Sequence, residues 1–433
     1  MMQTLKRRWL AFTVTTFLGV TACAAAWFLL SEWRSSVRVK AELTRLASLN
    51  LPVDDESAAA AFRASTHDEG ALAWAEILVS ANDAPTRQLP LPIVGNEDLP
   101  PHIDRNVPWQ DKQVAEFLDH QESVIAQVKQ AAEFPRPVWQ PLVFRGFETL
   151  LEPLQQARAV VRLLQLECEY AAYHQDAPRA LEAIEAQQVV AEAFDWHLAF
   201  VSELVHLALL DMQYTTIQRT LYCELWNEDQ VDRLLKQIAT PLDFRFRWKT
   251  TLASERGMAL ATMESGNLAR LGEAYSLVPF VTPRMIESYL DESIVWETLG
   301  AEDLNTAVSR TQQYEAAAYT GSDGWVEQLL GPALSACTQA YARSERTRRL
   351  TALALQIKAY SLRHGSWPDS LDALKEDGVN EADLCLPNGN RFFFVPGDES
   401  CELADRPRQP SESDADDDYS TSPKRQVVII GKH

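Results

Sequence analysis

Glu203 and His206 are the residues whose types and spacing come closest to a metal-binding pattern. They lie three positions apart, so a helix would place both side chains on one face. Di-iron helical bundles combine two Glu-x-x-His pairs with two further carboxylates from neighbouring helices. Glu167 or Glu169 and Glu192 could supply carboxylates, but the sequence holds no second Glu-x-x-His pair. We therefore expect a hydrogen-bonded histidine beside a core and no cofactor, with a metal ion at Glu203 and His206 as the alternative.

Sequence motifs that mark the common enzyme classes are absent from the chain. There is no Gly-x-Ser-x-Gly turn, no His-Glu-x-x-His, no phosphate-binding glycine loop and no dinucleotide fingerprint. No serine, cysteine or threonine has a base at a spacing that would identify it as a nucleophile. The sequence therefore favours a protein without catalytic activity. An anchored hydrolase or metal enzyme, with its residues scattered along the chain, stays the alternative.

The six cysteines are too few for a disulfide scaffold. Cys385 and Cys401 flank a predicted strand and its turn, which makes them the best candidate pair. In an oxidising compartment we predict a disulfide between these two residues.

Any such site depends on the elements that hold it, and the first of these is an apolar run over residues 9–30. This run has 22 positions without a charge and follows a basic tail, residues 1–8. A helix needs about 20 apolar residues to cross a bilayer. Trp9 and Trp27 lie near its two ends, where interfacial aromatic side chains are common. We predict a transmembrane anchor that contacts the bilayer through residues 9–30.

An alternative interpretation of this run concerns Cys23. The sequence Val20-Thr21-Ala22-Cys23 resembles a bacterial lipobox, which implies cleavage of the leader and lipidation of Cys23. The residues that follow, through Leu30, stay apolar where a lipoprotein usually turns polar. The uncleaved anchor is therefore the favoured interpretation.

The flanks of the anchor bear on its orientation. Arg34 and Arg38 follow the apolar run, so the number of basic residues near each end does not decide it. A short basic tail at the start of a chain is typical of a cytoplasmic N-terminus. We predict a single-pass protein of the bacterial inner membrane, with its body in the periplasm or envelope space.

The charge of the chain limits its partners. It carries 61 acidic against 40 basic side chains, a net charge of −21, and every acidic residue lies beyond the anchor. A body of this charge repels phosphate backbones, so the sequence argues against nucleic-acid binding.

The body, residues 31–331, is predicted to be a multi-helix body of helical hairpins. Only 16 of 433 residues are glycine, and apolar residues recur at three-and-four spacing from about residue 150 to 265. Asp176 and Pro178 suit a helix start, and Asn227 opens another helix. A proline-rich loop over residues 83–109 interrupts the helices.

Part of this body resembles a tetratricopeptide unit. The likeness covers about residues 157–194 and rests on Asp176-Ala-Pro-Arg-Ala-Leu before the second helix. It lacks the Trp and Gly positions of that family, and no period repeats three times. It implies a helical hairpin and leaves a regular solenoid unproven.

Residues 332–403 are predicted to form a long helix and a small α+β end with a short β-hairpin. The helix, with Tyr360 on its apolar seam, is expected to end at Gly365. Trp367 then turns back and Pro368 starts a short helix. Leu371 and Leu374 share one face of that helix. Residues 404–426 are acidic and predicted to be disordered. Residues 427–433 are a candidate final strand, which is expected to pair with a strand over residues 392–395.

The order of helix, Gly-x-Trp-Pro and small sheet resembles the C-terminal part of the major pseudopilin of type II secretion. It is equally similar to the ends of uncharacterised single-pass bacterial membrane proteins with helical bodies. The resemblance implies an envelope location and a local fold. Residues 9–30 lack the acidic residue of a pseudopilin N-terminal segment, and about 320 residues separate the two parts.

These observations together predict a mainly α protein with an N-terminal transmembrane helix. Its predicted function is that of a membrane-anchored extracytoplasmic scaffold or protein-interaction protein with a protein partner. An accessory component of a secretion or pilus-type system, suggested by the C-terminal resemblance, is an alternative.

Overall fold

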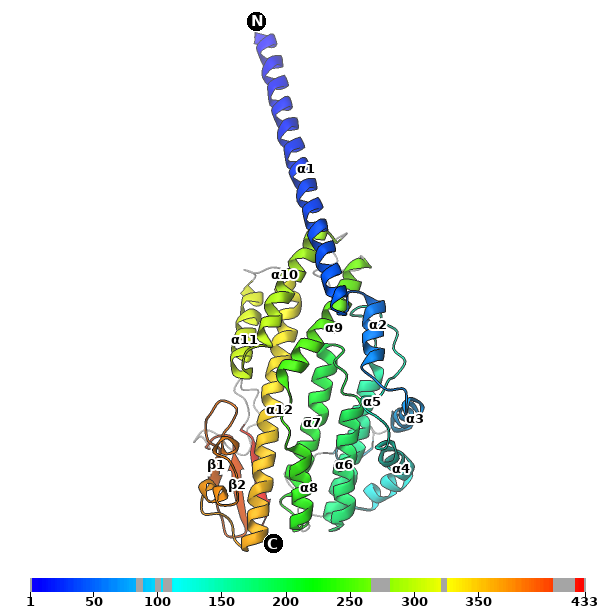
Figure 1. Ribbon diagram of the computed structural model, residues 1–433, viewed down its shortest axis with the longest axis vertical. Coiled ribbons are helices and arrows are strands. Elements are labelled where there is room, and N and C mark those ends of the chain that lie inside the picture. The colour runs from blue at the N-terminus through cyan, green and yellow to red at the C-terminus, as the bar shows by residue number, and fades with distance from the viewer. Residues whose placement is uncertain are drawn as a thin grey trace. The chain divides into compact units, whose positions relative to one another are not determined.

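The computed structural model describes residues 2–82, 89–97, 103, 111–265, 281–320, 325–407 and 425–431. Over these residues the chain forms twelve α-helices and one small sheet (Figure 1), which confirms the mainly α prediction. The helices are α1 (Met2–Ser48), α2 (Asp55–Ala64), α3 (Ala71–Asn82), α4 (Asp111–Ala131), α5 (Glu152–Tyr173), α6 (Ala177–Ala193), α7 (Phe200–Thr220), α8 (Glu228–Ile238), α9 (Phe244–Glu264), α10 (Pro283–Leu299), α11 (Leu304–Thr320) and α12 (Trp325–His364).

The chain divides into two compact units. Unit 1 comprises Met1–Ala61, Val143–Thr149 and Leu252–Leu299, and unit 2 comprises Phe62–Leu142, Leu150–Thr251 and Gly300–His433. The helical body over residues 31–331 is therefore drawn from both units.

Helix α1 dominates unit 1. It continues without a break to Ser48, so the predicted anchor and the helix after it are one element. Among the described residues, Thr15–Ser48 contains the one helix long and apolar enough to cross a membrane, and its apolar window is not buried in the protein. Cys23 lies in this exposed part as a free thiol. Further along, α1 packs against α10 and buries Ser35, Val39 and Leu46.

Helical hairpins form the centre of unit 2, as predicted from the apolar spacing. Helices α5, α6 and α7 pack against one another, and α3 and α4 cover α5. Asp176 caps α6, since its carboxylate accepts the Arg179 amide at 3.2 Å. Asn227 and Gln230 exchange hydrogen bonds in a capping box that starts α8. The tetratricopeptide-like repeat stays a prediction.

Helix α12 packs against α7, α8 and α11 within unit 2. It begins at Trp325 rather than at the predicted Pro332, and it continues through that proline. The apolar seam that carries Tyr360 is buried at Leu350, Leu353 and Ile357. Tyr360 is half-buried and stacks on His364 with ring centroids 4.1 Å apart.

The end of α12 follows the predicted motif. Gly365 takes a left-handed conformation at φ +72°, and its amide donates to the Ser361 carbonyl at 2.8 Å. Trp367 and Pro368 are buried. Leu371 and Leu374 are also buried, but they lie on a 3₁₀ helix, Leu371–Lys375, rather than on an α-helix. A second 3₁₀ turn covers Glu381–Leu384.

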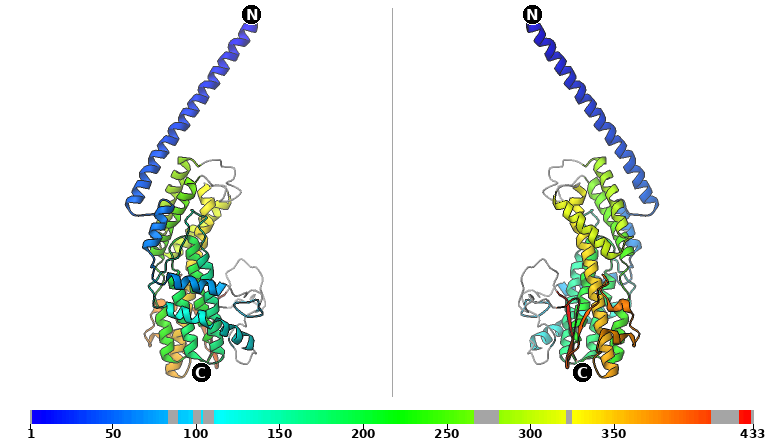
Figure 2. Two further views of the ribbon diagram at one scale, coloured as in Figure 1. Left: turned by 90° about the vertical axis from the view of Figure 1, so that its right-hand side faces the viewer. Right: turned by 90° about the vertical axis from the view of Figure 1, so that its left-hand side faces the viewer.

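Three antiparallel strands close unit 2: β1 (Phe393–Val395), β2 (Ser400–Ala404) and β3 (Val427–Gly431). Their spatial order is β1-β2-β3, so β1 and β2 form a hairpin and the final strand pairs with β2. Figure 2 shows these strands beside α12. The expectation that the final strand pairs with β1 is wrong, because β2 lies between them.

The predicted Cys385–Cys401 disulfide is not formed, since both residues are free thiols. Cys401 pairs with Ile430 inside the sheet, whereas Cys385 forms an isolated bridge with Arg391 outside it. The two cysteines therefore belong to different local pairings. Burial raises the pKa of Cys401 to about 12, which makes this thiol a poor nucleophile.

The last residue of β3, Gly431, is enclosed on several sides. Its amide donates to the Leu221 carbonyl at 3.1 Å, and its own carbonyl accepts from the ammonium of Lys358 at 2.7 Å. A Cβ on Gly431 would lie 2.0 Å from the Tyr222 carbonyl oxygen. Lys358 is fully buried, and burial lowers its pKa to about 8. Only glycine fits at this position.

Two predicted irregular segments are described in part. Within the proline-rich loop, Leu91, Val94 and Ile103 are buried, while residues 83–88, 98–102 and 104–109 lie outside the described residues. Residues 408–424 of the acidic segment also lie outside them. At its described edges, Ala404 belongs to β2 and the Asp405 amide donates to the Gln426 carbonyl at 3.2 Å.

Candidate functional site

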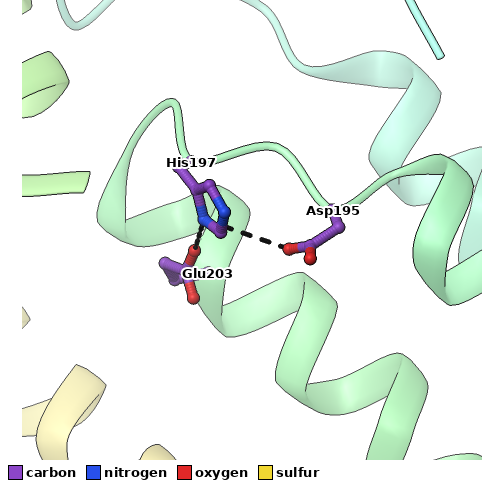
Figure 3. Close-up of side chains that lie close together, drawn as sticks. All are labelled: Asp195, His197 and Glu203. Carbon is purple, nitrogen blue, oxygen red and sulfur yellow. Dashed lines mark hydrogen bonds and ion pairs between the residues drawn. The ribbon is translucent and has the colours of Figure 1, made fainter. Parts of the chain in front are cut away.

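A group of described titratable residues that could hold a metal ion lies where α6 passes into α7. Asp195 and His197 are on the connection between these helices, and Glu203 is in the first turn of α7 (Figure 3). One ligand atom from each of the three lies within 4.8 Å of the others. We call Asp195, His197 and Glu203, with the Arg247 described below, the α6–α7 cluster.

Aromatic packing fixes the connection that carries Asp195 and His197. Trp196 is buried between Phe62 and Phe194, with ring centroids 5.1 and 5.4 Å away. Its indole N–H donates to the Val138 carbonyl at 2.9 Å. Phe194 also meets Trp74 edge-on at 5.4 Å. Because Trp196 points into the core, its two neighbours along the chain are held at the cluster.

The start of α7 is fixed by Ser202. Its hydroxyl oxygen accepts the Ala199 amide at 2.9 Å, and the hydroxyl lies 2.7 Å from the Trp196 carbonyl, to which it donates. Ser202 is fully buried. This local set of hydrogen bonds aims the next residue, Glu203, toward α9 and α12.

Arg247, from the first turns of α9, joins the two carboxylates. Its two terminal nitrogens donate to the two Asp195 oxygens at 2.6 and 2.9 Å, a bidentate pair. Its Nε and Nη2 also donate to Glu203 Oε2 at 3.1 and 3.0 Å. The guanidinium is buried, so the two carboxylates share one cation away from bulk water.

Three further side chains satisfy Glu203. His197 Nδ1 lies 2.8 Å from Oε1, and the Thr251 hydroxyl donates to the same oxygen at 3.2 Å. The Tyr341 hydroxyl, from α12, donates to Oε2 at 2.5 Å. Every oxygen of this fully buried carboxylate therefore has at least two donors.

The electrostatics keep both carboxylates ionised. Burial alone would raise the pKa of Glu203, but the His197 hydrogen bond and the Arg247 charge outweigh it and lower this pKa to about 2. Burial likewise opposes ionisation of Asp195, while His206 and Arg247 facing it hold its pKa below the usual range. The pKa of Tyr341 is raised by burial and by the Glu203 charge, so its hydroxyl stays a donor.

The structure places the predicted pair, Glu203 and His206, in the same buried region. Their side chains do not converge on one position where a metal ion could bind. His206 Nδ1 lies 3.2 Å from the Ala191 carbonyl and 3.5 Å from Asp195 Oδ1. Burial lowers the pKa of His206. This is the hydrogen-bonded histidine that the sequence indicated, and His197 takes the place beside Glu203.

The other candidate carboxylates are each paired with an arginine. Glu167 accepts from Arg179 and Glu169 from Arg219, both at 2.6 Å. Glu192 lies 3.0 Å from the Arg136 guanidinium. The alternative metal site that would use these carboxylates does not assemble among the described residues, because their side chains pair with arginines instead.

The α6–α7 cluster has ligand types that suit zinc or iron, so its fit to a metal ion can be judged from the geometry. Arg247 donates to both carboxylates and already places a positive charge between them. A divalent cation bound to Asp195 and Glu203 would have to displace that guanidinium. In this conformation the residues fit a hydrogen-bonded ion-pair network better than a metal site.

Sequence reasoning missed Asp195, His197, Arg247 and Tyr341. The sequence Asp195-Trp-His197 is short and lies between helices, so helical periodicity could not identify it. Arg247 and Tyr341 contact Glu203 across 44 and 138 positions of sequence. Comparison of the chain with known protein families, curated proteins and solved structures found no match.

Proposed function

We propose that this protein is a membrane-anchored helical scaffold whose body binds another protein. The observation that carries the proposal is the outer face of α3. Leu72 is 82% and Val79 54% exposed, and they share one face of that helix, seven positions apart. A helix that only supports a core keeps its outward side chains polar. Exposed apolar side chains that share a face are typical of a binding surface.

A groove beside this face extends the candidate binding surface. It has a volume of about 420 Å³ and lies between α3 and α4 of unit 2. Glu76 and Gln127 contribute to its polar lining, and Phe134 contributes an aromatic edge. Such a mixed groove suits a protein segment with a few apolar side chains and some hydrogen-bonding groups.

The α6–α7 cluster supports a scaffold role in a different way. Glu203 accepts hydrogen bonds on both oxygens and pairs with Arg247, so this carboxylate is engaged within the body. Its proposed task is to hold α7, α9 and α12 together.

Photo-crosslinking tests the binding surface. A photoreactive amino acid placed at Leu72 in the full chain is expected to give one discrete crosslinked protein species in intact cells. The matched control is Lys236, an exposed position on α8 of the same unit, which is expected to give none. A result with no product from Leu72, or the same products from both positions, would contradict the proposal.

We further propose that the body lies outside the cytoplasm of a bacterium, with the N-terminus inside. The exposed apolar part of α1 and the basic tail before it support this orientation. Protease added to intact spheroplasts is expected to digest the body while a cytoplasmic marker stays intact. Digestion of the body only after lysis would place it in the cytoplasm instead.

A further inference from the structure

A groove lies in unit 1 where α1 meets the start of α10. Its volume is about 170 Å³. Trp27 and Leu30 form its apolar end, and Arg34 and Arg38 lie at its other end together with Glu287 of α10. The lining residues of α1 recur at three-and-four spacing, so they form one stripe along the helix.

The groove begins where the apolar run ends. Arg34 is four residues beyond Leu30, which corresponds to about 6 Å along a helix. The headgroup region of one leaflet is about 5 to 7 Å thick. Side chains of an α-helix also lean toward its N-terminus, which for α1 is the direction of the apolar run. Arg34 and Arg38 would therefore reach lipid headgroups if α1 crosses a bilayer.

The charges of the groove favour an anion. Arg38 pairs with Glu287 at 2.8 Å, and Glu287 is hydrogen-bonded by Ser35 and then by Arg38, which lowers its pKa. Arg34 has no ion-pair partner among the described residues. The lining of the groove thus contains two guanidinium groups and one carboxylate, which leaves a net positive charge. The exposed Arg38 side chain keeps donors free for a second acceptor.

We propose that this groove binds the phosphate of an anionic phospholipid, with Arg34 and Arg38 as donors to the phosphate oxygens. The apolar end, with Trp27 71% exposed, contacts the upper part of an acyl chain. Guanidinium groups bind phosphate through several hydrogen bonds at once. The proposal rests on the proposed membrane anchor.

A lipid fits this groove better than free phosphate does. Inorganic phosphate would use the two arginines and leave Trp27 and Leu30 in water. A phospholipid satisfies both ends because its phosphate is attached to an apolar tail. The two sources share the same phosphate chemistry, so the experiment below includes both.

The test uses the full chain in nanodiscs of equimolar phosphatidylcholine and phosphatidylglycerol. Native mass spectrometry after partial delipidation measures the ratio of the two lipids retained on the protein. We expect the wild type to retain phosphatidylglycerol preferentially and Arg34→Gln to reduce that preference about fivefold. Lys40→Gln removes the same charge from an exposed position outside the groove and is expected to have little effect.

A second variant works in the opposite direction. Glu287→Gln removes the carboxylate that engages Arg38, so it is expected to increase the preference for phosphatidylglycerol. A purely structural role of this pair would not produce that increase.

The outcomes separate this proposal from the anchor on which it rests. Equal losses of the preference for phosphatidylglycerol in Arg34→Gln and Lys40→Gln would show that the effect comes from general surface charge. That result would overturn the proposal. Competition by inorganic phosphate would assign the groove to the free anion and also overturn it. Entry into nanodiscs without lipid preference refutes this proposal alone, whereas failure of the full chain to enter them refutes the anchor as well.

Discussion

Replacing Arg247 by methionine is expected to lower the free energy of unfolding of the full chain by about 3 to 5 kcal/mol. The substitution leaves Asp195 and the fully buried Glu203 ionised without the cation that joins them. Removal of one partner of a buried ion pair costs more than the pair contributes, because the remaining charges stay out of water. Urea titration of the detergent-solubilised protein measures the effect.

Arg245→Met is the matched control for this prediction. Arg245 lies two positions earlier on α9 and is exposed, so its replacement is expected to change the free energy of unfolding by less than about 0.5 kcal/mol. If Arg247→Met alone prevents folding, the triple variant Asp195→Asn, Glu203→Gln, Arg247→Met removes all three charges. It should recover much of the lost free energy of unfolding. Equal stability of Arg247→Met and Arg245→Met would show that the network contributes nothing.

Acid titration gives a second readout of the same network. The folded pKa of Glu203, about 2, lies below the unfolded value of 4.5, so the unfolded chain binds more protons between these values. The stabilisation is therefore present above about pH 4.5 and is lost as the pH falls toward 2. In Arg247→Met the pH range over which this stabilisation is lost should become narrower, because the positive charge that helps to lower the pKa of Glu203 is gone.

Replacing Gly431 by alanine is expected to release β3 from unit 2. The added Cβ would approach the Tyr222 carbonyl oxygen to 2.0 Å, and a backbone atom cannot move aside as a flexible side chain can. Displacement of the strand would also take the acceptor away from the buried Lys358 ammonium. Overpacking of this kind costs about 1 to 3 kcal/mol. We expect a loss of about 2 kcal/mol in strand docking, which corresponds to about thirtyfold more open state.

Trypsin cleavage after Arg425 reports this opening, since that residue precedes β3 and is tied to Glu402 of β2 in the closed state. Cleavage there should accelerate about thirtyfold in Gly431→Ala. Val427→Ala, a change on the same strand at a side chain that is 38% exposed, should alter the rate only slightly. Unchanged cleavage in Gly431→Ala would mean that the strand accommodates the extra methyl group.

The helical part of the fold was predictable because its signals are local. Asp176 and Asn227 mark helix starts through hydrogen bonds to amides a few positions away. Strand β2 was missed for the opposite reason. It is five residues long, and its pairing with β3 depends on a segment more than twenty positions later. The likeness of the C-terminal part to a pseudopilin stays a prediction.

The candidate site was predictable only in part. Periodicity placed Glu203 and His206 on one helical face, and both are buried there. It could not predict which side chains face them, because Arg247 and Tyr341 arrive from α9 and α12. Tertiary packing assigned the partners, and it placed His197 rather than His206 beside Glu203.

The unbroken course of α1 has a mechanical consequence. Residues 31–48 contain neither glycine nor proline, and the helix passes through them without a kink-forming residue. At 1.5 Å per residue they form a stiff rod about 27 Å long. A rotation or tilt imposed on the apolar portion of α1 would therefore be transmitted to α10 as torque, because no hinge within residues 31–48 would absorb it.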